Sequence, residues 1–288
     1  RMLADRFNTL QMGMVSSARV FDLLDNDEII HQSKNNQLES FNGQISFKNV
    51  HFSYDGRSKV FDGLSLDVKS GETIAVVGPT GAGKTSLINL ISRYYEFQEG
   101  EILLDGMDIR SISLSSLRSK VAVVLQDVFL FNTSVLENIT LGKEEIELEE
   151  VIEAAKKVGV HGFISQLDGS YEFQVKERGG VLSSGQRQLI SFLRAYICKP
   201  DLLILDEATS SVDSGAEELI QQATKVITKD RTSIIIAHRL STIKNADRIL
   251  VIDRGKIIEE GNHNTLIQKK GHYFDLYENQ FLKEESIL

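Results

Sequence analysis

The sequence predicts an α/β fold around a mainly parallel sheet, and three observations lead to this fold class. Short runs of apolar, mostly β-branched residues recur along the chain, which is the pattern of strands buried on both faces of a parallel sheet. Helix-like patterns separate several of these runs. A glycine-rich turn joins one run directly to a predicted helix. The runs comprise residues 73–77, 121–125, 202–205 and 233–236.

The composition is ordinary for a globular protein. The chain has 288 residues, of which 41% are hydrophobic and 25% charged, enough for one large domain or two modest ones. A net charge of −9 argues against a nucleic-acid partner. The single cysteine, Cys198, excludes an intramolecular disulfide, and its apolar neighbours predict a core position. No apolar run reaches the roughly 18 residues that a membrane-spanning helix needs.

Residues 1–25 differ from the rest of the chain. Apolar residues recur at steps of four and three from Leu3 to Leu24, interrupted once by Ser17, and this heptad-like stripe predicts a helix. The chain begins with Arg1 and shows no helix-start signal, so we expect a helix cut from a longer chain. A peripheral helix packed on its own domain is the alternative. Residues 26–43 are polar and predict a linker to a domain over 44–288.

This domain begins with strands and then alternates between strands and helices. Strict alternation over 45–50, and a strand-like pattern up to Val68, predict an antiparallel sheet ahead of the glycine-rich turn. The remaining predicted elements are a helix over 84–94, a strand over 101–105, a mainly helical stretch over 147–189, a hairpin of 249–252 and 256–258, and a helical tail over 265–281.

The glycine-rich turn carries the clearest chemistry. It fits the pattern G-x-x-x-x-G-K-[ST] at every fixed position, between a strand and a helix as this phosphate loop requires. Glycines let backbone N–H groups surround phosphate oxygens, Lys84 can reach the β- and γ-phosphates, and the Thr85 hydroxyl can ligate Mg²⁺. We therefore predict a site for a nucleoside triphosphate with Mg²⁺. Its residues are Gly78, Pro79, Thr80, Gly81, Ala82, Gly83, Lys84, Thr85 and Ser86.

Polar side chains follow two of the other apolar runs. Asp206 and Glu207 end the run 202–205, where the edge of a parallel sheet places them beside the phosphate loop. Asp206 is then positioned to hold Mg²⁺ and Glu207 to activate a water, although a solvated acidic turn is the alternative. His238 ends the run 233–236 and can bind the γ-phosphate. The other histidines are interpreted as bystanders: His31, His51, His161, His263 and His272.

A further turn precedes an apolar helix and has no obvious partner within the chain. Its hydroxyls and free N–H groups suit an anion, but the phosphate loop already accounts for the triphosphate. We call this turn the signature, and it consists of Leu182, Ser183, Ser184, Gly185 and Gln186.

The ordered set of these motifs resembles the nucleotide-binding domain of an ABC transporter, over roughly residues 44–281. The resemblance implies a phosphate-loop NTPase core with an antiparallel β subdomain and an α-helical signature subdomain. It also implies that two such domains meet head to tail, each ATP lying between one phosphate loop and the other domain's signature. Tyr54 would stack on adenine, an ordinary strand aromatic being the alternative, and Gln126 would complete the Mg²⁺ shell of Thr85 and Asp206. The implied catalytic residues are Glu207 as base, His238, Gln126 and Lys84, and the implied cross-dimer D-loop is Ser211, Val212 and Asp213.

Several segments resemble the exporter branch of this family. They are residues 126–131, 137–139, 177–179 and 237–242. The resemblance implies a transport-coupled ATPase at the cytoplasmic face of a cell membrane, fused to a membrane domain whose last helix continues into residues 1–25. A free-standing importer ATPase and a non-transport ABC ATPase remain as alternatives. The presence of Glu207 argues against a non-hydrolytic regulator.

Ser184 departs from the family pattern, in which glycine occupies this position. A serine side chain restricts the close approach of backbone to phosphate. We hypothesise that the ATP site completed by this signature is weakened, as in heterodimeric exporters. A tolerated substitution in a homodimer is an equally weighted alternative.

Overall fold

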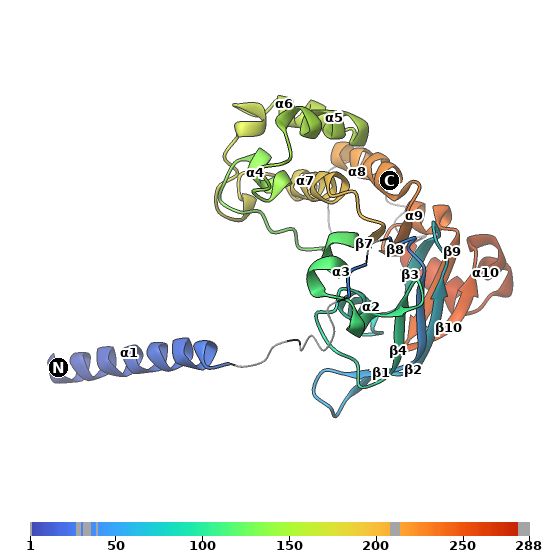
Figure 1. Ribbon diagram of the computed structural model, residues 1–288, viewed down its shortest axis with the longest axis horizontal. Coiled ribbons are helices and arrows are strands. Elements are labelled where there is room, and N and C mark those ends of the chain that lie inside the picture. The colour runs from blue at the N-terminus through green and yellow to red at the C-terminus, as the bar shows by residue number, and fades with distance from the viewer. Residues whose placement is uncertain (1, 27–29, 31–35, 39, 208–213, 282–288) are drawn as a thin grey trace. The chain divides into compact units, whose positions relative to one another are not determined.

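The computed structural model describes residues 2–26, 30, 36–38, 40–207 and 214–281 (Figure 1). The chain divides into two units, residues 1–31 and residues 32–288. Among the described helices, none is both long enough and apolar enough to cross a membrane.

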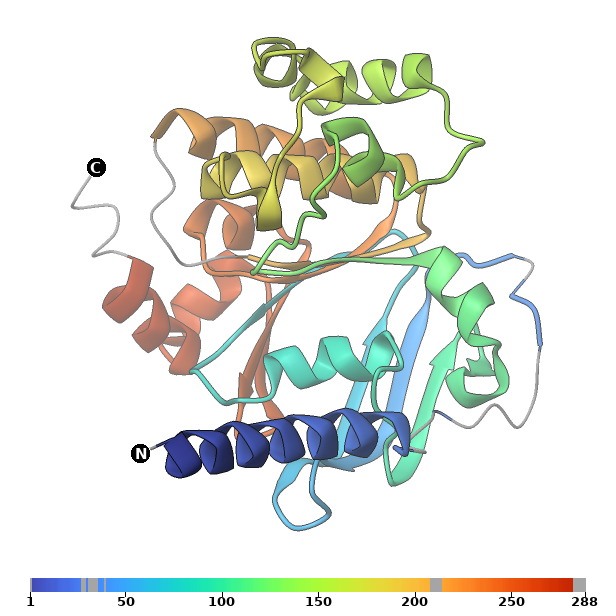
Figure 2. The ribbon, with the colours of Figure 1, turned by 90° about the vertical axis from the view of Figure 1, so that its left-hand side faces the viewer.

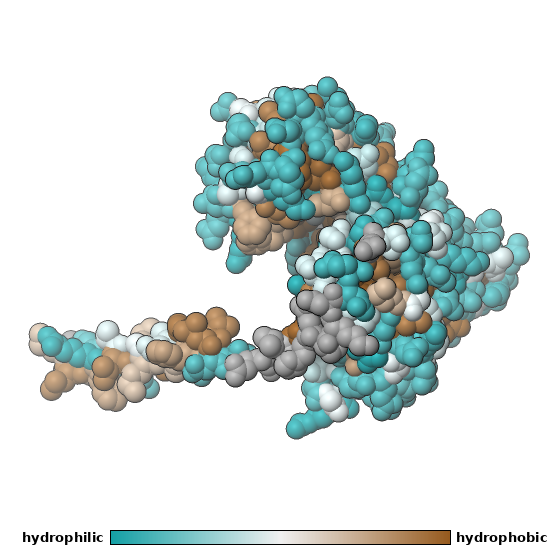
Figure 3. Space-filling model, in the orientation of Figure 1, coloured by the Kyte–Doolittle hydropathy of each residue, from teal (hydrophilic) through white to brown (hydrophobic). Residues whose placement is uncertain are grey.

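The first unit is the helix α1 (Met2–Leu24), which confirms the helix predicted from the apolar stripe. None of the side chains over this range is buried, and Phe7 and Phe21 are 66% and 60% exposed. Figure 3 shows apolar side chains exposed along the helix. Its assignment to the end of a membrane-domain helix stays a prediction.

The second unit is built on a mainly parallel sheet, as predicted. The strand order is β10–β9–β3–β8–β7–β6, and every neighbouring pair is parallel except β9 with β10. The antiparallel pair is the predicted hairpin. The strands are β3 (Thr73–Val77), β6 (Val121–Val124), β7 (Leu202–Asp206), β8 (Thr232–Ile236), β9 (Arg248–Asp253) and β10 (Lys256–Gly261).

The central strands are buried on both faces because alternate side chains point to opposite sides of the sheet. Ile74 and Val76 of β3 join one apolar cluster, whereas Ala75 and Val77 join the other. Helix α2 (Lys84–Ile91) belongs to the first cluster, and α7 (Ser184–Ile197) and α8 (Ser214–Thr228) belong to the second. Figure 2 shows α2 below the sheet and α7 and α8 above it. The phosphate-loop helix and the signature helix therefore lie on opposite faces.

The predicted antiparallel sheet is present, with the strand order β2–β1–β4–β5. The strand predicted over 101–105 begins at Glu99 and ends at Leu104, and β5 was not predicted. Its apolar side chains, such as Phe47 and Leu66, join the same cluster as α2. This sheet is thereby fixed against the phosphate-loop helix. Its strands are β1 (Ile45–Ser53), β2 (Lys59–Val68), β4 (Glu99–Leu104) and β5 (Met107–Asp108).

The chain segment that connects β6 to β7 is mainly helical, as the pattern over 147–189 predicts. The amphipathic helix α5 (Leu148–Val158) buries Val151, Ala155 and Val158, and Gly159 ends it with φ 85°. A left-handed residue after the last turn favours glycine. The other helical segments here are α4 (Val135–Thr140), α6 (His161–Ser165), η2 (Ser170–Glu172) and η3 (Glu177–Gly179).

Several remaining helical segments differ from the prediction. The helix predicted over 84–94 ends at Ile91, and the predicted continuous tail is broken at Lys270 and Gly271. Lys270 has φ 51° and ends α10, so the chain turns before the next helix starts. These segments are η1 (Ile109–Ser111), α3 (Leu114–Lys120), α9 (Leu240–Asn245), α10 (His263–Lys269), α11 (His272–Leu276) and η4 (Tyr277–Phe281).

The end of the predicted linker packs into the second unit. Leu38 and Phe41 are 4% and 6% exposed and belong to the cluster that contains α2. The backbone N–H of Leu38 donates to Ser116 Oγ at 2.8 Å. The sequence did not predict the burial of Leu38 and Phe41, because residues 26–43 are polar overall.

Replacing Ser233 with Ala should stabilise the domain. Ser233 lies in β8 with 0% exposure, and its Oγ has no hydrogen-bond partner among the described residues. A buried hydroxyl without a partner costs stability, so Ser233→Ala should raise the free energy of unfolding by about 1 kcal/mol. Ser116→Ala is the matched control, because that hydroxyl accepts a hydrogen bond, and it should lower stability by about 1 kcal/mol. Urea unfolding measures both, and equal losses for the two variants would contradict the prediction.

Candidate nucleotide-binding site

The predicted site residues follow the carboxyl ends of four strands that lie side by side. In the order β3, β8, β7 and β6, each strand is parallel to its neighbour. Their ends therefore meet at one edge of the sheet, with adjacent strands about 4.8 Å apart. The phosphate loop follows β3, His238 follows β8, Glu207 follows β7, and Gln126 follows β6. The topology thus brings together motifs that are far apart in the sequence, at the edge where such sheets bind ligands.

Two glycines of the phosphate loop are required by close packing. Gly78 has φ 152°, and a Cβ there would lie 2.0 Å from the carbonyl oxygen of Ile252. Gly83 has φ 109°, and a Cβ there would lie 2.8 Å from the ring of Phe61. Any side chain at either position would displace the loop from the strands behind it. Between them, Pro79, Thr80 and Gly81 are exposed.

The loop leads directly into α2 with unpaired backbone donors. The first hydrogen bond of the helix runs from Leu87 N to Gly83 O at 3.1 Å. The N–H groups of the preceding turn, Lys84 to Ser86, consequently have no acceptor within the helix. Such a turn suits phosphate oxygens, because its donors converge and the helix dipole is positive there. The exposed Thr85 hydroxyl lies in the same turn.

Lys84 is buried in the loop, with 9% exposure. Its Nζ donates to Gly78 O at 2.7 Å and to Pro79 O at 2.9 Å. Burial lowers the pKa of Lys84, and the negative charge of Asp206 counteracts this. The ammonium group is therefore held at the mouth of the loop and lies within electrostatic reach of β7.

Asp206 and His238 complete the electrostatics around this ammonium group. Burial raises the pKa of Asp206, the positive charge of Lys84 lowers it, and the negative charge of Asp127 raises it. Burial also lowers the pKa of His238, and the charge of Lys84 lowers it further. His238 is consequently a neutral imidazole at neutral pH, able to donate one hydrogen bond and accept another.

Glu207 is almost fully buried, with 3% exposure. Its Oε1 accepts a hydrogen bond from Thr242 Oγ1 at 2.6 Å, and its Oε2 accepts from the backbone N–H groups of His238 and Arg239, both at 3.3 Å. Burial raises the pKa of Glu207, whereas the Thr242 hydroxyl, the charge of Arg239 and the two backbone donors lower it. Thr242 and Arg239 were not predicted. The histidine motif at the end of β8 was the nearest signal for them.

The residues fit Mg²⁺ bound together with a nucleotide. Within the described part of the chain, no group of three or more His, Cys, Asp or Glu side chains could hold a metal ion. Mg²⁺ needs no such cage, because it typically takes one or two carboxylates, substrate phosphates and water. Asp206 supplies a carboxylate within electrostatic reach of Lys84, and Thr85 supplies a hydroxyl next to Lys84 in the sequence. The exposed Gln126 follows the neighbouring strand β6.

Tyr54 is anchored beside the phosphate-loop helix. Its hydroxyl lies 2.9 Å from Ser86 Oγ and accepts from Asn89 Nδ2 at 2.9 Å. The ring meets Phe52 and Tyr95 edge to face, with centroids 4.8 Å apart in both pairs. The Tyr54 side chain remains 48% exposed, so part of it is accessible to solvent. Asn89 and Tyr95 were not predicted as part of this arrangement.

The signature forms the start of α7. Ser183 caps the helix, its Oγ accepting from Gln186 N at 3.2 Å while Gln186 Oε1 accepts from Ser183 N at 3.0 Å. Leu182 and Gly185 are buried, whereas Ser184 is exposed in the first helical position. Within the described residues, no hydrogen bond or ion pair joins residues 182–186 to the phosphate loop. In the described part of the chain, the signature is thus formed at the start of α7 without a polar contact to the phosphate loop.

The remaining predicted residues are placed as follows. Ser211, Val212 and Asp213 lie outside the described residues, as does His31. Three histidines interpreted as bystanders have ordinary side-chain partners: His51 with Asp62, His161 with Tyr171, and His263 with Tyr273. His272 is exposed.

Known proteins resemble the chain along almost all of its length. A family model described as ABC transporter matches residues 61–210. The chain is 49% identical over 280 residues to the uncharacterized ABC transporter ATP-binding protein YknV of Bacillus subtilis (strain 168), covering 97% of this chain and 46% of that protein. It is 47% identical over 274 residues to the fatty acid ABC transporter ATP-binding/permease protein of Mycobacterium tuberculosis (strain CDC 1551 / Oshkosh), covering 95% and 43%.

A solved structure shares the fold. The structure of a bacterial Atm1-family ABC exporter with ATP bound superposes with a TM-score of 0.83 at 36% identity, covering 97% of this chain and 49% of that one. The chain therefore spans about half the length of the relatives it matches.

Proposed function

Because the chain belongs to the ABC transporter family, we propose that it is the ATP-hydrolysing motor domain of a membrane exporter. The observation that carries this proposal is the shared strand edge, where Lys84 lies within electrostatic reach of both Asp206 and His238, and where Glu207 directly follows Asp206 at the end of β7. The name of one relative, an ABC exporter, supports export, and the name of another, an ATP-binding/permease protein, supports fusion to a membrane domain.

Each residue of the edge has a separate part in the proposed reaction. Lys84 and the backbone N–H groups of the phosphate loop bind and orient the β- and γ-phosphates. Glu207 accepts the proton of the attacking water, and His238 donates a hydrogen bond to the γ-phosphate. Bound Mg²⁺, held by Thr85, Asp206 and Gln126, would neutralise negative charge on the phosphates. The half-exposed Tyr54 would stack on the adenine base.

Two copies of the domain complete the sites. The signature lies on the α7 side of the sheet and the phosphate loop on the α2 side, which supports a head-to-tail arrangement with the signature facing another chain's ATP. ATP between the two domains would hold them closed, and hydrolysis would let them open. The partner is a second nucleotide-binding domain, either the same chain or a related one, and Asp213 would contact it.

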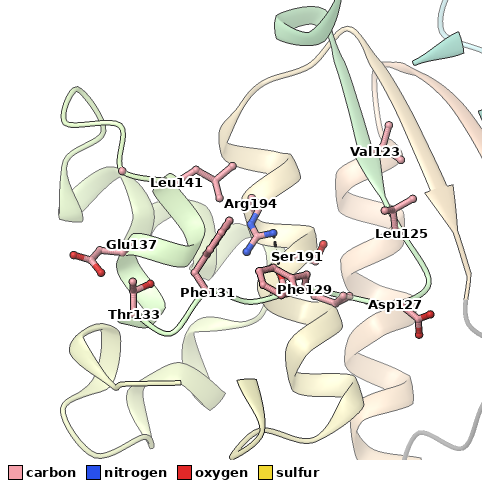
Figure 4. Close-up of a pocket in the computed structure, with 12 residues that line it drawn as sticks. Val123, Leu125, Asp127, Phe129, Phe131, Thr133, Glu137, Leu141, Ser191 and Arg194 are labelled. Carbon is pink, nitrogen blue, oxygen red and sulfur yellow. Dashed lines mark hydrogen bonds between the residues drawn. The ribbon is translucent and has the colours of Figure 1, made fainter. Parts of the chain in front are cut away.

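A groove beside β6 suits a membrane domain. Its volume is about 790 Å³, and Figure 4 shows side chains from the segment after β6, from α4 and from α7 around it. Phe129 and Phe131 are each 52% exposed in this groove, and Arg194 fixes the backbone there by donating to Asn138 O at 2.8 Å and to Phe129 O at 3.3 Å. The groove starts next to Gln126, so a docked helix would contact the ATP site through this segment. The domain would thus work at the cytoplasmic face of a membrane, with residues 1–25 continuing a membrane-domain helix.

Residues 177–179 connect this groove to the signature. A Cβ on Gly179 would lie 2.9 Å from Leu130 and 3.0 Å from Arg187. Gly179 has φ 68°, and Arg178 before it has φ 53°. Residues 177–179 are thus packed tightly between the segment after Gln126 and the start of α7. A membrane domain docked in the groove would therefore contact the signature through this segment.

Replacing Ser184 with Gly should raise ATP turnover if the signature weakens its site. Ser184 has helical backbone geometry and an exposed side chain, so glycine is not needed for the local fold but would open space for a phosphate group. We expect a rise of about three- to tenfold, and Ser184→Ala should give an intermediate value. Phosphate release by this chain, alone and mixed with candidate partner domains, measures the effect. No gain with any partner would support a tolerated substitution.

Steady-state phosphate release by the purified chain with Mg·ATP tests the proposed function directly. We expect turnover that saturates with ATP and requires Mg²⁺. Tight ATP binding without turnover, both by the chain alone and by the chain mixed with candidate partner domains, would contradict a motor and would favour a non-hydrolytic regulator.

A further inference from the structure

Among the described residues, one side chain hydrogen-bonds to the carboxylate of Glu207, and it comes from a different element. Thr242 lies in α9, and its Oγ1 donates to Glu207 Oε1 at 2.6 Å. This distance is typical of a strong hydrogen bond from a hydroxyl to an ionised carboxylate. We propose that Thr242 is a positioning residue that fixes the orientation of the Glu207 carboxylate for hydrolysis. The inference rests on the proposed role of Glu207 as base.

The two backbone hydrogen bonds to the carboxylate do not fix its orientation without Thr242. Both backbone donors, His238 N and Arg239 N, bind the same oxygen, Oε2, and both are at 3.3 Å. The terminal torsion of a glutamate side chain is broad and has no deep staggered minima. With one oxygen loosely held, the plane of the carboxylate can rotate unless the second oxygen is fixed.

The hydroxyl of Thr242 is used differently from those of three other threonines in described helices. Thr9, Thr224 and Thr228 each donate to the carbonyl oxygen four residues earlier, at 2.8 to 2.9 Å. This local bond is the usual partner of a threonine hydroxyl inside a helix. Thr242 instead donates to a side chain that precedes it by 35 residues. Its hydroxyl is therefore engaged with Glu207 and does not cap the backbone of α9.

The orientation of the carboxylate matters because a general base must lie within hydrogen-bond reach of its water. The reach is about 2.6–3.2 Å, and a displacement of about 1 Å can cost about a hundredfold in rate. Arg239 adds positive charge near Glu207, but its side chain makes no hydrogen bond to the carboxylate in the described part of the structure. The Arg239 guanidinium therefore does not replace Thr242 as an orienting group.

Thr242→Val tests the proposal, because valine keeps the shape and removes the hydroxyl. In steady-state assays of the 288-residue chain, kcat should fall about ten- to a hundredfold while KM for Mg·ATP stays within about twofold. The dissociation constant of a fluorescent ATP analogue should also stay unchanged. Thr242→Ser restores the donor and should recover kcat to within about threefold of the unmodified chain. Ser241→Ala is the matched control, because it removes the neighbouring hydroxyl of α9 and should leave kcat unchanged.

A double variant separates positioning from a structural role. In single-turnover assays, adding Thr242→Val to Glu207→Gln should give no further loss, because Thr242 acts through Glu207. The proposal would be overturned by a further loss in the double variant or by a Thr242→Ser variant as slow as Thr242→Val. It would also be overturned if Thr242→Val changed KM alone or kept full kcat. An unmodified chain without turnover, both alone and mixed with candidate partner domains, would overturn the proposed function and the role of Thr242 together. If the unmodified chain turned over ATP normally and Thr242→Val had no effect, only the proposed role of Thr242 would be overturned.

Discussion

Replacing Glu207 with Gln should remove most ATP turnover and leave ATP binding intact. The amide has the shape of the carboxylate and can satisfy the same neighbours: its oxygen can accept from the backbone N–H groups of His238 and Arg239, and its NH₂ can donate to the Thr242 hydroxyl. The fold around β7 is thus preserved, but the group can no longer accept a proton from water. General-base catalysis contributes about 10²- to 10⁴-fold, so kcat should fall by that factor.

Phosphate release and the solution mass of the variant measure two separate consequences. Turnover at saturating Mg·ATP gives the loss in kcat, and light scattering with and without Mg·ATP reports on association. We expect an ATP-dependent doubling of mass, because slow hydrolysis leaves the closed pair occupied. A doubling would show that identical chains can build both sites, and a monomer that binds ATP would point to a different partner or to the membrane domain.

Glu153→Gln is the matched control for this substitution. Glu153 is exposed on α5, far from β7 in the sequence, and its replacement removes the same charge. It should leave both turnover and mass unchanged. Normal hydrolysis by Glu207→Gln would contradict the assignment of the base.

The strand edge could be predicted from the sequence because its signals are local. Residues 73–77, 202–205 and 233–236 each read as buried strands, and each is followed by a polar group with a recognisable spacing. The order of strands then places those groups together, since parallel strands end on the same side. The antiparallel sheet was also predicted from local alternation over 45–68.

Other features depend on contacts between distant segments, and the sequence carried no usable signal for them. The bond between Thr242 and Glu207 and the anchoring of Tyr54 by Asn89 join elements that meet only after folding. The hydrogen bond from Leu38 N to Ser116 Oγ joins distant segments in the same way. Helices α3, α4 and α9 are too short to show a periodic pattern.

Helix α8 is a different case, because a usable signal was present. Its residues Ile220, Ala223 and Ile227 are buried and spaced by three and four, as an amphipathic helix requires. The hydroxyl of Thr224 beside them donates within the helix. This helix could have been predicted from periodicity alone.

Replacing Lys84 with Ala should abolish tight nucleotide binding. Lys84 is the buried cation at the mouth of the loop, and its Nζ donates to Gly78 O and Pro79 O. We expect the β- and γ-phosphates to bind beside this ammonium group. Removing one partner of a buried, hydrogen-bonded charge pair costs about 2–5 kcal/mol. ATP affinity should therefore fall roughly 30- to 5000-fold, and turnover should fall with it.

Isothermal titration with Mg·ATP measures this loss, and two comparisons show where it arises. Lys157→Ala removes the same charge from the exposed face of α5 and should leave affinity unchanged, which separates the contact at the loop from the net charge of the domain. Thermal unfolding without nucleotide shows whether the loss of the two loop contacts unfolds the domain. If Lys84→Ala bound ATP with normal affinity, the triphosphate would have to lie elsewhere than on the phosphate loop. In that case the roles proposed for Asp206, Glu207 and His238 would lose their common ligand, because each depends on a phosphate group held beside Lys84.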